Sequence, residues 1–282
     1  MFHYPQFNPV AFSIGPLQVR WYGIMYLAAF LLVWIGLRMR ANVPWSKVKP
    51  NNVDDVVFYG ALGAIVGGRI GYMLVYAHQE LIADPLSIFT VWKGGMSFHG
   101  GLSGVLIAMW LYGRHKGIKF FDLTDAIAPW SAGGIFFGRI GNFINGELWG
   151  KIADPNAPWA VIVNGEPRHP SQLYEAFLEG LVLSTVLWFY TRKPRPTAAA
   201  SGLFLILYGV FRILIEFVRV PDEQLGYLSL GWVTMGQILS VPMVILGAII
   251  FTLAIRGGRG ADNAPSQDAP RSPRSAMQKK AG

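Results

Sequence analysis

Apolar residues gather into seven long runs along the chain, separated by shorter polar or glycine-rich stretches. A helix that crosses the hydrocarbon core of a bilayer needs roughly 20 mostly apolar residues. The runs that meet or approach this length are 20–38, 56–76, 97–113, 122–145, 172–191, 202–219 and 236–256. The pattern therefore predicts an all-α polytopic membrane protein with about seven transmembrane helices.

The composition supports a membrane protein. Of the 282 residues, 52% are hydrophobic and 14% are charged, whereas a soluble domain carries about 25% charged residues. The chain has no cysteine, which excludes disulfides, thiolate metal sites and a cysteine nucleophile of its own. The net charge of +8 could indicate nucleic-acid binding, but the basic residues lie in short blocks between apolar runs. Membrane topology explains that pattern better, and no nucleic-acid partner is expected.

Blocks of basic residues follow the first, third, fifth and seventh runs, so they alternate along the chain. They consist of Arg38, Arg40, Lys47 and Lys49; Arg114, Lys116 and Lys119; Arg192, Lys193 and Arg195; and Arg256, Arg259, Arg271, Arg274, Lys279 and Lys280. Positively charged linkers stay on the cytoplasmic side of a membrane. The N-terminus is therefore predicted to lie outside and the C-terminus in the cytoplasm.

Two of the segments outside the predicted spans have distinctive sequences. Residues 146–171 form an external loop in which Ala160–Val163 resembles a short strand and precedes the turn pair Asn164-Gly165, so we expect a small ordered arm there. Residues 257–282 are rich in Gly, Pro, Ser and Arg and have no apolar periodicity, which predicts a disordered tail. Its basic residues either contact anionic membrane lipids or are solvated. Residues 1–256 are predicted to form a single transmembrane domain.

The fourth run ends in a polar, glycine-rich motif, Gly138–Gly150, with the sequence GRIGNFINGELWG. Ionisable groups are expensive inside a membrane and mark functional sites by default. Arg139 and Asn142 are three residues apart and share a helix face, and a guanidinium suits a phosphodiester or a carboxylate. Glu147 follows the helix. The alternative interpretation is an Arg–Glu ion pair that locks two helices together.

The sixth run carries a polar stripe. Tyr208, Arg212 and Glu216 recur every four residues, so they lie on one face of an otherwise apolar helix. Such a stripe indicates a cavity wall rather than a lipid-facing surface. Arg212 and Arg139 come from different runs, and together they make a plausible clamp for one phosphate.

Other polar groups allow two interpretations each. Arg69 lies among the glycines of the second run, whose GxxxG spacings indicate close helix packing, and it either pairs structurally or binds a lipid phosphate. Tyr22 and Tyr26 in the first run either line a site or belong to the interfacial belt of aromatic residues.

His99 begins the sequence HGGLSG at the predicted external mouth of the third run. Its imidazole, with an ordinary pKa of about 6.5, suits a general base, and a structural histidine is an equal alternative. The same stretch contains the GxSG pattern of intramembrane serine proteases, which requires a later histidine to activate Ser103. His115 and His169 are both poorly placed for that role, so Ser103 is expected to pack between helices.

These motifs resemble those of the prolipoprotein diacylglyceryl transferases. The resemblance rests on GRIGNFINGELWG, HGGLSG, the RHPSQLYE of Arg168–Glu175 and two shorter matches, and it covers all of the chain except the tail. It implies a multi-pass enzyme of the bacterial inner membrane whose active site faces the periplasm. Such an enzyme transfers the diacylglyceryl group of phosphatidylglycerol to the lipobox cysteine thiol of a prelipoprotein, releasing glycerol phosphate, without a cofactor. This is the first step of bacterial lipoprotein maturation.

The resemblance also assigns roles to residues. It matches Arg139 and Arg212 to arginines that bind the lipid phosphate, and His99 to a histidine that assists deprotonation of the thiol. Glu147 is implied as base, orienter or counter-ion. The further positions that it implies for lipid binding, of which the last two match less strongly, are Tyr26, Asn142, Tyr208, Glu216, Arg69 and Glu175.

A lipid transporter or flippase is the strongest alternative, because polar residues inside spans also line transport paths. It predicts lipid movement without covalent change, so the mass of the product distinguishes it from a transferase.

Overall fold

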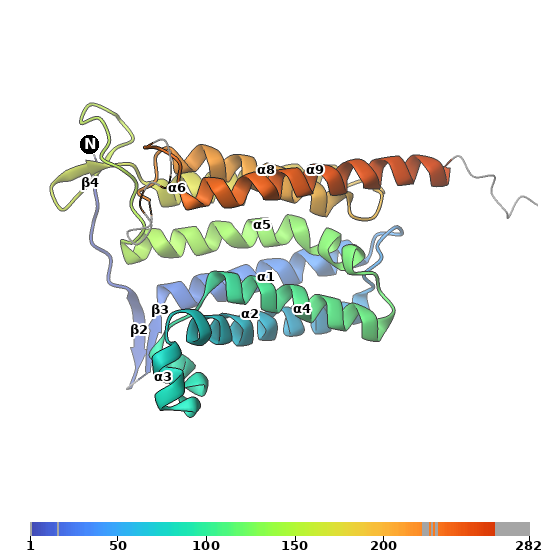
Figure 1. Ribbon diagram of the computed structural model, residues 1–282, viewed down its shortest axis with the longest axis horizontal. Helices are drawn as coiled ribbons and strands as arrows, with labels where there is room; N and C mark the ends of the chain where they lie inside the picture. Colours follow the sequence, from blue (N-terminus) through green and yellow to red (C-terminus); the bar gives the residue numbers. More distant parts are fainter. Residues whose placement is uncertain (1, 16, 222–225, 227, 229–230, 263–282) are drawn as a thin grey trace, which may run out of the picture.

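The computed structural model describes residues 2–15, 17–221, 226, 228 and 231–262. Long helices lie side by side and form a bundle (Figure 1). They are α1 (Trp21–Ala41), α2 (Val53–Val75), α4 (Phe98–Lys116), α5 (Phe120–Asn145), α8 (Ala199–Glu216), α9 (Met235–Asp262), and a continuous helix made of α6 (Ser171–Glu175), the π-helical η4 (Ala176–Val182) and α7 (Leu183–Tyr190). Each apolar run of the sequence coincides with one of these helices.

Among the described residues, five helical segments are long and apolar enough to cross a membrane. They are Trp21–Ala41, Pro50–Val75, Ser171–Tyr190, Ala199–Glu216 and Met235–Gly258. Helices α4 and α5 also form at the predicted places, but they carry more polar residues. The prediction of an all-α membrane protein is therefore confirmed at this level.

Helix α9 runs to Asp262, beyond Gly257, where the tail was predicted to begin. The chain thus leaves the helix later than its glycine-rich composition indicates. The rest of the predicted tail, residues 263–282, lies outside the described residues.

Small strands gather at one end of the bundle, and short helices lie in the linkers between the long ones (Figure 1). The strands are β1 (Phe2–His3), β2 (Val10–Ile14), β3 (Leu17–Arg20), β4 (Val161–Val163) and β5 (Glu166–Arg168), and the short helices between the spans are η1 (Pro50–Asn52), α3 (His78–Ala83), η2 (Pro85–Phe89) and η3 (Val91–Lys93). Strands β4 and β5 pair antiparallel, β1 joins β4 in parallel, and β2 and β3 form a separate hairpin.

The hairpin β4–β5 confirms the predicted arm. Asn164 and Gly165 both have positive φ, 51° and 85°, which is the conformation that a two-residue hairpin turn of type I′ requires. The N-terminal hairpin β2–β3 was not predicted, because its strands are short and lie directly before the first span.

Glycines bring α2 and α4 into backbone contact. A Cβ atom on Gly63 would lie 2.5 Å from the carbonyl oxygen of Gly104, and one on Gly71 would lie 2.7 Å from the Cα of Gly100. No side chain fits in that space, so the predicted role of the GxxxG spacings in helix packing is confirmed. Ser103, on α4, is exposed, so the expectation that it packs between helices is wrong.

Asp125 on α5 has a structural task. Its carboxylate accepts hydrogen bonds from the backbone N–H groups of Ala198 and Ser201 and from the Ser201 hydroxyl, at 2.6 to 2.8 Å. These donors belong to the first turn of α8, whose N–H groups have no partner within the helix. A residue of one span thus caps the beginning of another and fixes how α5 and α8 pack.

Candidate active site

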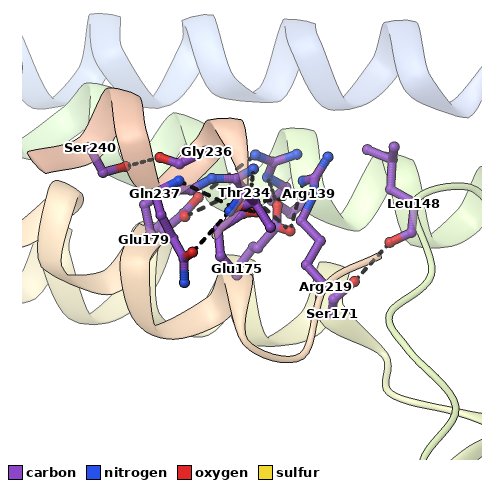
Figure 2. Close-up of polar contacts among 12 residues, drawn as sticks. Arg139, Leu148, Ser171, Glu175, Glu179, Arg219, Thr234, Gly236, Gln237 and Ser240 are labelled. Atoms are coloured by element: carbon purple, nitrogen blue, oxygen red, sulfur yellow. Dashed lines mark hydrogen bonds and ion pairs between the residues drawn. The ribbon is translucent and has the colours of Figure 1, made fainter. Parts of the chain in front are cut away.

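Three helices each place charged side chains at one level of the bundle interior. Arg139 comes from the last turns of α5, Glu175 and Glu179 from α6 and η4, and Arg212 and Glu216 from α8. Within α6–η4 and within α8 the charged residues are four apart, so each pair lies on one helix face. Figure 2 shows Arg139, Glu175, Glu179 and Arg219 converging on the same point.

Glu175 lies at the centre of this charged cluster. It is buried, with 1% of its surface exposed, and it lies within ion-pair distance of three arginines. Its Oε2 lies 2.6 Å from Nε of Arg139, and its Oε1 lies 3.2 Å from Nη1 of Arg219 and 3.6 Å from Nη1 of Arg212. A buried carboxylate needs such partners, because burial of an unpaired charge is very costly.

Glu216 is the second buried carboxylate of the cluster. Its Oε1 lies 2.5 Å from Nη2 of Arg212 and 3.7 Å from Nε of Arg219, and its Oε2 accepts a 2.6 Å hydrogen bond from the Thr234 hydroxyl. Arg212 and Glu216, predicted to share a helix face, therefore form an ion pair, and Tyr208 lies one turn earlier on the same helix. Thr234 precedes α9, so this contact ties α9 to the cluster.

Glu179 differs from the other two carboxylates. Glu179 is fully buried. Its Oε2 lies 3.7 Å from Nη2 of Arg139, and its Oε1 lies 3.9 Å from Nη1 of Arg212. Within the described part of the chain neither oxygen accepts a hydrogen bond. It belongs to the π-helical segment η4, a conformation that occurs frequently at functional sites.

A second group of polar side chains continues from Arg139 toward the end of α5. Nη1 of Arg139 donates to the Asn142 side chain at 3.4 Å, and Nδ2 of Asn142 donates to Oε1 of Glu147 at 2.7 Å. Glu147 follows Gly146, whose φ of +68° ends the helix. The side chain of Gln172 donates to the backbone carbonyl of Glu147 at 2.5 Å, so the start of α6 holds this turn in place.

Arg139 therefore connects a buried cluster to an exposed carboxylate. The three arginines of the cluster keep 12 to 20% of their side-chain surface exposed, whereas the carboxylates keep 3% or less. The arginine side chains are thus the part of the cluster that a ligand can reach, although Nη1 of Arg212 is itself buried. Guanidinium forks bind carboxylates and phosphates in a bidentate way, so the arrangement suits an anion.

Tyr22 and Tyr26 lie beside this region. A Cβ on Gly141 of α5 would come within 2.9 Å of the Tyr22 ring, so α1 packs directly next to Asn142. The ring centroids of Tyr22 and Tyr26 are 5.1 Å apart, and Tyr26 is 47% exposed. Tyr26 consequently faces outward from α1.

Two predicted site residues are not part of the cluster. Arg69 is buried, and its guanidinium donates to the carbonyl groups of Ser87 and Gly94, each at 2.6 Å, and of Ile88 at 3.1 Å. Its donors thus organise the segment between α2 and α4, which supports the structural interpretation of this arginine. His99 lies exposed in the first turn of α4, and in the described residues its side chain makes a ring contact with Phe98 only.

No group of three His, Asp or Glu side chains among the described residues is arranged to hold a metal ion. The charged groups instead balance one another, since the three arginines of the cluster face three glutamates.

Comparison with known proteins identifies the family. A family model described as prolipoprotein diacylglyceryl transferase matches residues 9–253, which include every helix of the cluster. The chain belongs to the prolipoprotein diacylglyceryl transferase family.

Relatives from several bacterial genera match this transferase over nearly their whole length. A phosphatidylglycerol–prolipoprotein diacylglyceryl transferase of Methylococcus capsulatus is 54% identical over 258 residues, which cover 90% of this chain and 98% of the relative. One from Pseudomonas aeruginosa is 55% identical, with 91% and 97% covered. One from Solidesulfovibrio magneticus is 52% identical, with 95% and 99% covered.

Sequence reasoning missed part of the transferase's cluster. Glu179 was not predicted, although its spacing of four from Glu175 inside an apolar run was a visible signal. Thr234 and Gln172 carry no such signal, because each is an ordinary polar residue next to a span. Their roles depend on which helices the tertiary fold brings together.

Proposed function

We propose that this chain transfers the diacylglyceryl group of phosphatidylglycerol to the thiol of a prelipoprotein lipobox cysteine. The observation that carries the proposal is the cluster of reachable guanidinium groups over buried carboxylates, in a chain 54% identical to a transferase named for this reaction. The proposed product is a thioether-linked lipid anchor, and glycerol phosphate is released. Because the chain has no cysteine, the sulfur nucleophile has to come from the substrate.

We infer seven spans, with the N-terminus outside and the C-terminus in the cytoplasm of the bacterial inner membrane. In support, α4 with 19 and α5 with 26 residues are about 28 and 39 Å long at 1.5 Å per residue, near or beyond a hydrocarbon core of about 30 Å. The alternating basic linkers support the orientation. The charged cluster then opens toward the periplasmic side, where α5 ends and the strands gather.

Arg139 and Arg212 are the proposed binding groups for the lipid phosphate. Their side chains keep 20% and 15% of their surface exposed, so a phosphate can approach both. Arg219 reaches the same carboxylates and can share the charge. Each charge-assisted hydrogen bond contributes roughly 1.5–3 kcal/mol, which favours a bound phosphodiester at this place.

In the proposed step, the thiolate sulfur attacks the glyceryl carbon that is bonded to the phosphate oxygen. The C–S bond forms as the C–O bond breaks, and the electron pair of that bond leaves with glycerol phosphate. The thiol proton passes to a base, for which His99 and Glu147 are the candidates. Proximity of the two substrates and stabilisation of the leaving phosphate by the arginines supply the acceleration.

Asn142, Glu216, Tyr26 and Tyr208 have supporting roles in this proposal. Asn142 holds Arg139 and Glu147 in one hydrogen-bonded chain, and Glu216 orients Arg212. Tyr208, one turn from Arg212, and the exposed Tyr26 are the proposed lining of the lipid path.

Product mass tests the proposal. Purified protein is incubated with phosphatidylglycerol and a synthetic lipobox peptide, and the peptide is weighed by mass spectrometry, with Arg139→Ala in parallel. A diacylglyceryl adduct is expected from the wild-type protein and none from the variant. A folded, lipid-loaded wild-type protein that yields no adduct would support the lipid-transport alternative instead.

A further inference from the structure

A polar cleft lies at the end of the bundle opposite the strands, the end on the right-hand side of Figure 1. It has a volume of about 220 Å³ and opens between the end of α1, the start of α5 and the turn from α7 to α8. At about 30 Å³ per water molecule it has room for a phosphate group with part of its substituent. This site is separate from the charged cluster, since the two share no lining residue.

Three cations line the cleft, Arg40, Lys47 and Arg195. None of them lies within ion-pair distance of a carboxylate in the part of the chain that the structure describes. Arg40 is only partly exposed. Like charges repel at short range, so three cations that form no ion pair and outnumber the two aspartates of the lining favour an anionic ligand.

Two aspartates also line the cleft, but their oxygens are engaged elsewhere. Asp125 caps the first turn of α8 through the N–H groups of Ala198 and Ser201, and Asp122 accepts a 2.8 Å hydrogen bond from the Thr197 hydroxyl. These carboxylates therefore accept hydrogen bonds from α8 and the turn before it, and they form no ion pair with the three cations.

The cations are held on ordered backbone. Nε of Arg195 donates to the Tyr190 carbonyl at 2.7 Å, and its guanidinium lies 4.2 Å from the Tyr190 ring centroid, which leaves its terminal nitrogens available. Lys47 follows the buried Ser46, whose hydroxyl donates to the Val48 carbonyl at 2.8 Å. Arg195 is thus pre-organised, and a pre-organised donor loses little entropy when it binds a ligand.

We propose that this cleft binds the phosphate group of an anionic ligand, either the headgroup of an inner-leaflet phospholipid or free phosphate. Trp45 on its rim is typical of the membrane–water interface, and the cytoplasmic leaflet is rich in anionic headgroups that basic residues attract. The site lies outside the transfer chemistry, and its existence does not depend on the proposed reaction.

The test compares two triple variants of equal charge. The cleft variant is Arg40→Gln/Lys47→Gln/Arg195→Gln, and the control is Arg114→Gln/Lys119→Gln/Arg192→Gln, which removes two arginines and a lysine from the same side of the molecule outside the cleft. Each full-length protein in detergent is titrated with phosphatidylserine and with phosphatidylcholine of the same acyl chains, and bound lipid is counted by native mass spectrometry. Inorganic phosphate is titrated separately against the thermal unfolding midpoint.

The wild type and the control are expected to prefer phosphatidylserine, and the cleft variant to bind it roughly tenfold more weakly. Lys47→Gln alone, on an exposed lysine, gives a smaller loss of affinity and serves if the triple variant does not fold. A response to inorganic phosphate without any lipid preference, lost only in the cleft variant, would identify free phosphate as the ligand. Equal losses in the cleft variant and the control would overturn the proposal, as would a wild type that ignores both probes.

Discussion

At the scale of single residues, the cluster shows how one helix face balances charge in an apolar surrounding. Glu175 makes the short contacts to Arg139 and Arg219, whereas Glu179 stays at 3.7 Å or more from any guanidinium nitrogen. The two carboxylates are one turn apart and have different surroundings. Removing the charge of Glu175 and removing that of Glu179 should therefore have different effects on the protein.

Glu179→Gln is expected to lower the KM for phosphatidylglycerol by about tenfold, a change of about 1.4 kcal/mol. The variant removes one negative charge from a cluster that is otherwise balanced, so an incoming phosphodiester meets a net positive site. Steady-state kinetics with varied lipid in mixed micelles measure this. An unchanged or higher KM in a normally folded variant would show that Glu179 does not act on lipid binding through its charge.

Glu175→Gln is the matched comparison, because it changes the same group one turn away. Here a short ion pair is lost, and removal of one partner from a buried pair costs roughly 3–5 kcal/mol. Thermal unfolding should therefore show a clear loss of stability for Glu175→Gln and a much smaller one for Glu179→Gln. Equal losses would contradict the distinction drawn from the distances.

Arg69 offers a third residue-scale prediction. Its side chain bonds to several carbonyl groups between α2 and α4, so Arg69→Met should lower the free energy of unfolding by about 2–4 kcal/mol. The same variant should make residues 84–97 more sensitive to proteases. Arg114→Met, at the other end of α4, is the control and should leave that segment protected.

At the scale of elements, the contact between α2 and α4 depends on absent side chains. A Cβ on Gly63 would lie 2.5 Å from a carbonyl oxygen of the facing helix, whereas one on Gly60 would meet only the flexible end of Met109 at 3.8 Å. The two glycines are less than one turn apart. Comparing substitutions at these two glycines therefore separates the contribution of helix packing to stability from that of helix propensity.

Gly63→Ala is expected to destabilise the protein, because the helices have to move apart to make room. Gly60→Ala should be neutral or stabilising by up to about 1 kcal/mol, since alanine has the higher helix propensity. Thermal unfolding in detergent measures both changes. A Gly60→Ala variant as unstable as Gly63→Ala would mean that flexibility of the helix, rather than close approach, explains these glycines.

At the scale of the whole molecule, the inferred topology sets where each site lies. The charged cluster is placed near the strand-bearing end and the cationic cleft at the opposite end of the bundle (Figure 1). The absence of cysteine makes the orientation directly measurable, because any introduced thiol is the only one in the chain.

Asn164→Cys, in the turn of the hairpin β4–β5, should react with a membrane-impermeant maleimide in intact cells with an opened outer membrane. Lys193→Cys, in the linker after α7, should react only after the inner membrane is opened. Both positions are exposed on the protein. The side of the membrane on which each one lies, rather than burial, therefore decides whether it is labelled. The reverse pattern would invert the topology and place the charged cluster on the cytoplasmic side.

The sequence by itself determined the helices, the family and the polar residues that matter most. Apolar runs define spans because hydrocarbon tolerates few other structures, and Arg139, Arg212 and Glu216 stand out because charge is rare in such runs. The turn at Asn164-Gly165 was also readable, since a local backbone preference decides it.

Only the tertiary structure decided which of these residues meet. Glu179 gains its place between two arginines from the packing of η4 against α5 and α8, and Arg69 is engaged by a loop whose path no local pattern predicts. Asp125, an acidic residue inside an apolar run, proves to cap another helix. In each case the partner lies far away in the chain, and periodicity describes one helix at a time. Contact between helices is a property of the folded molecule.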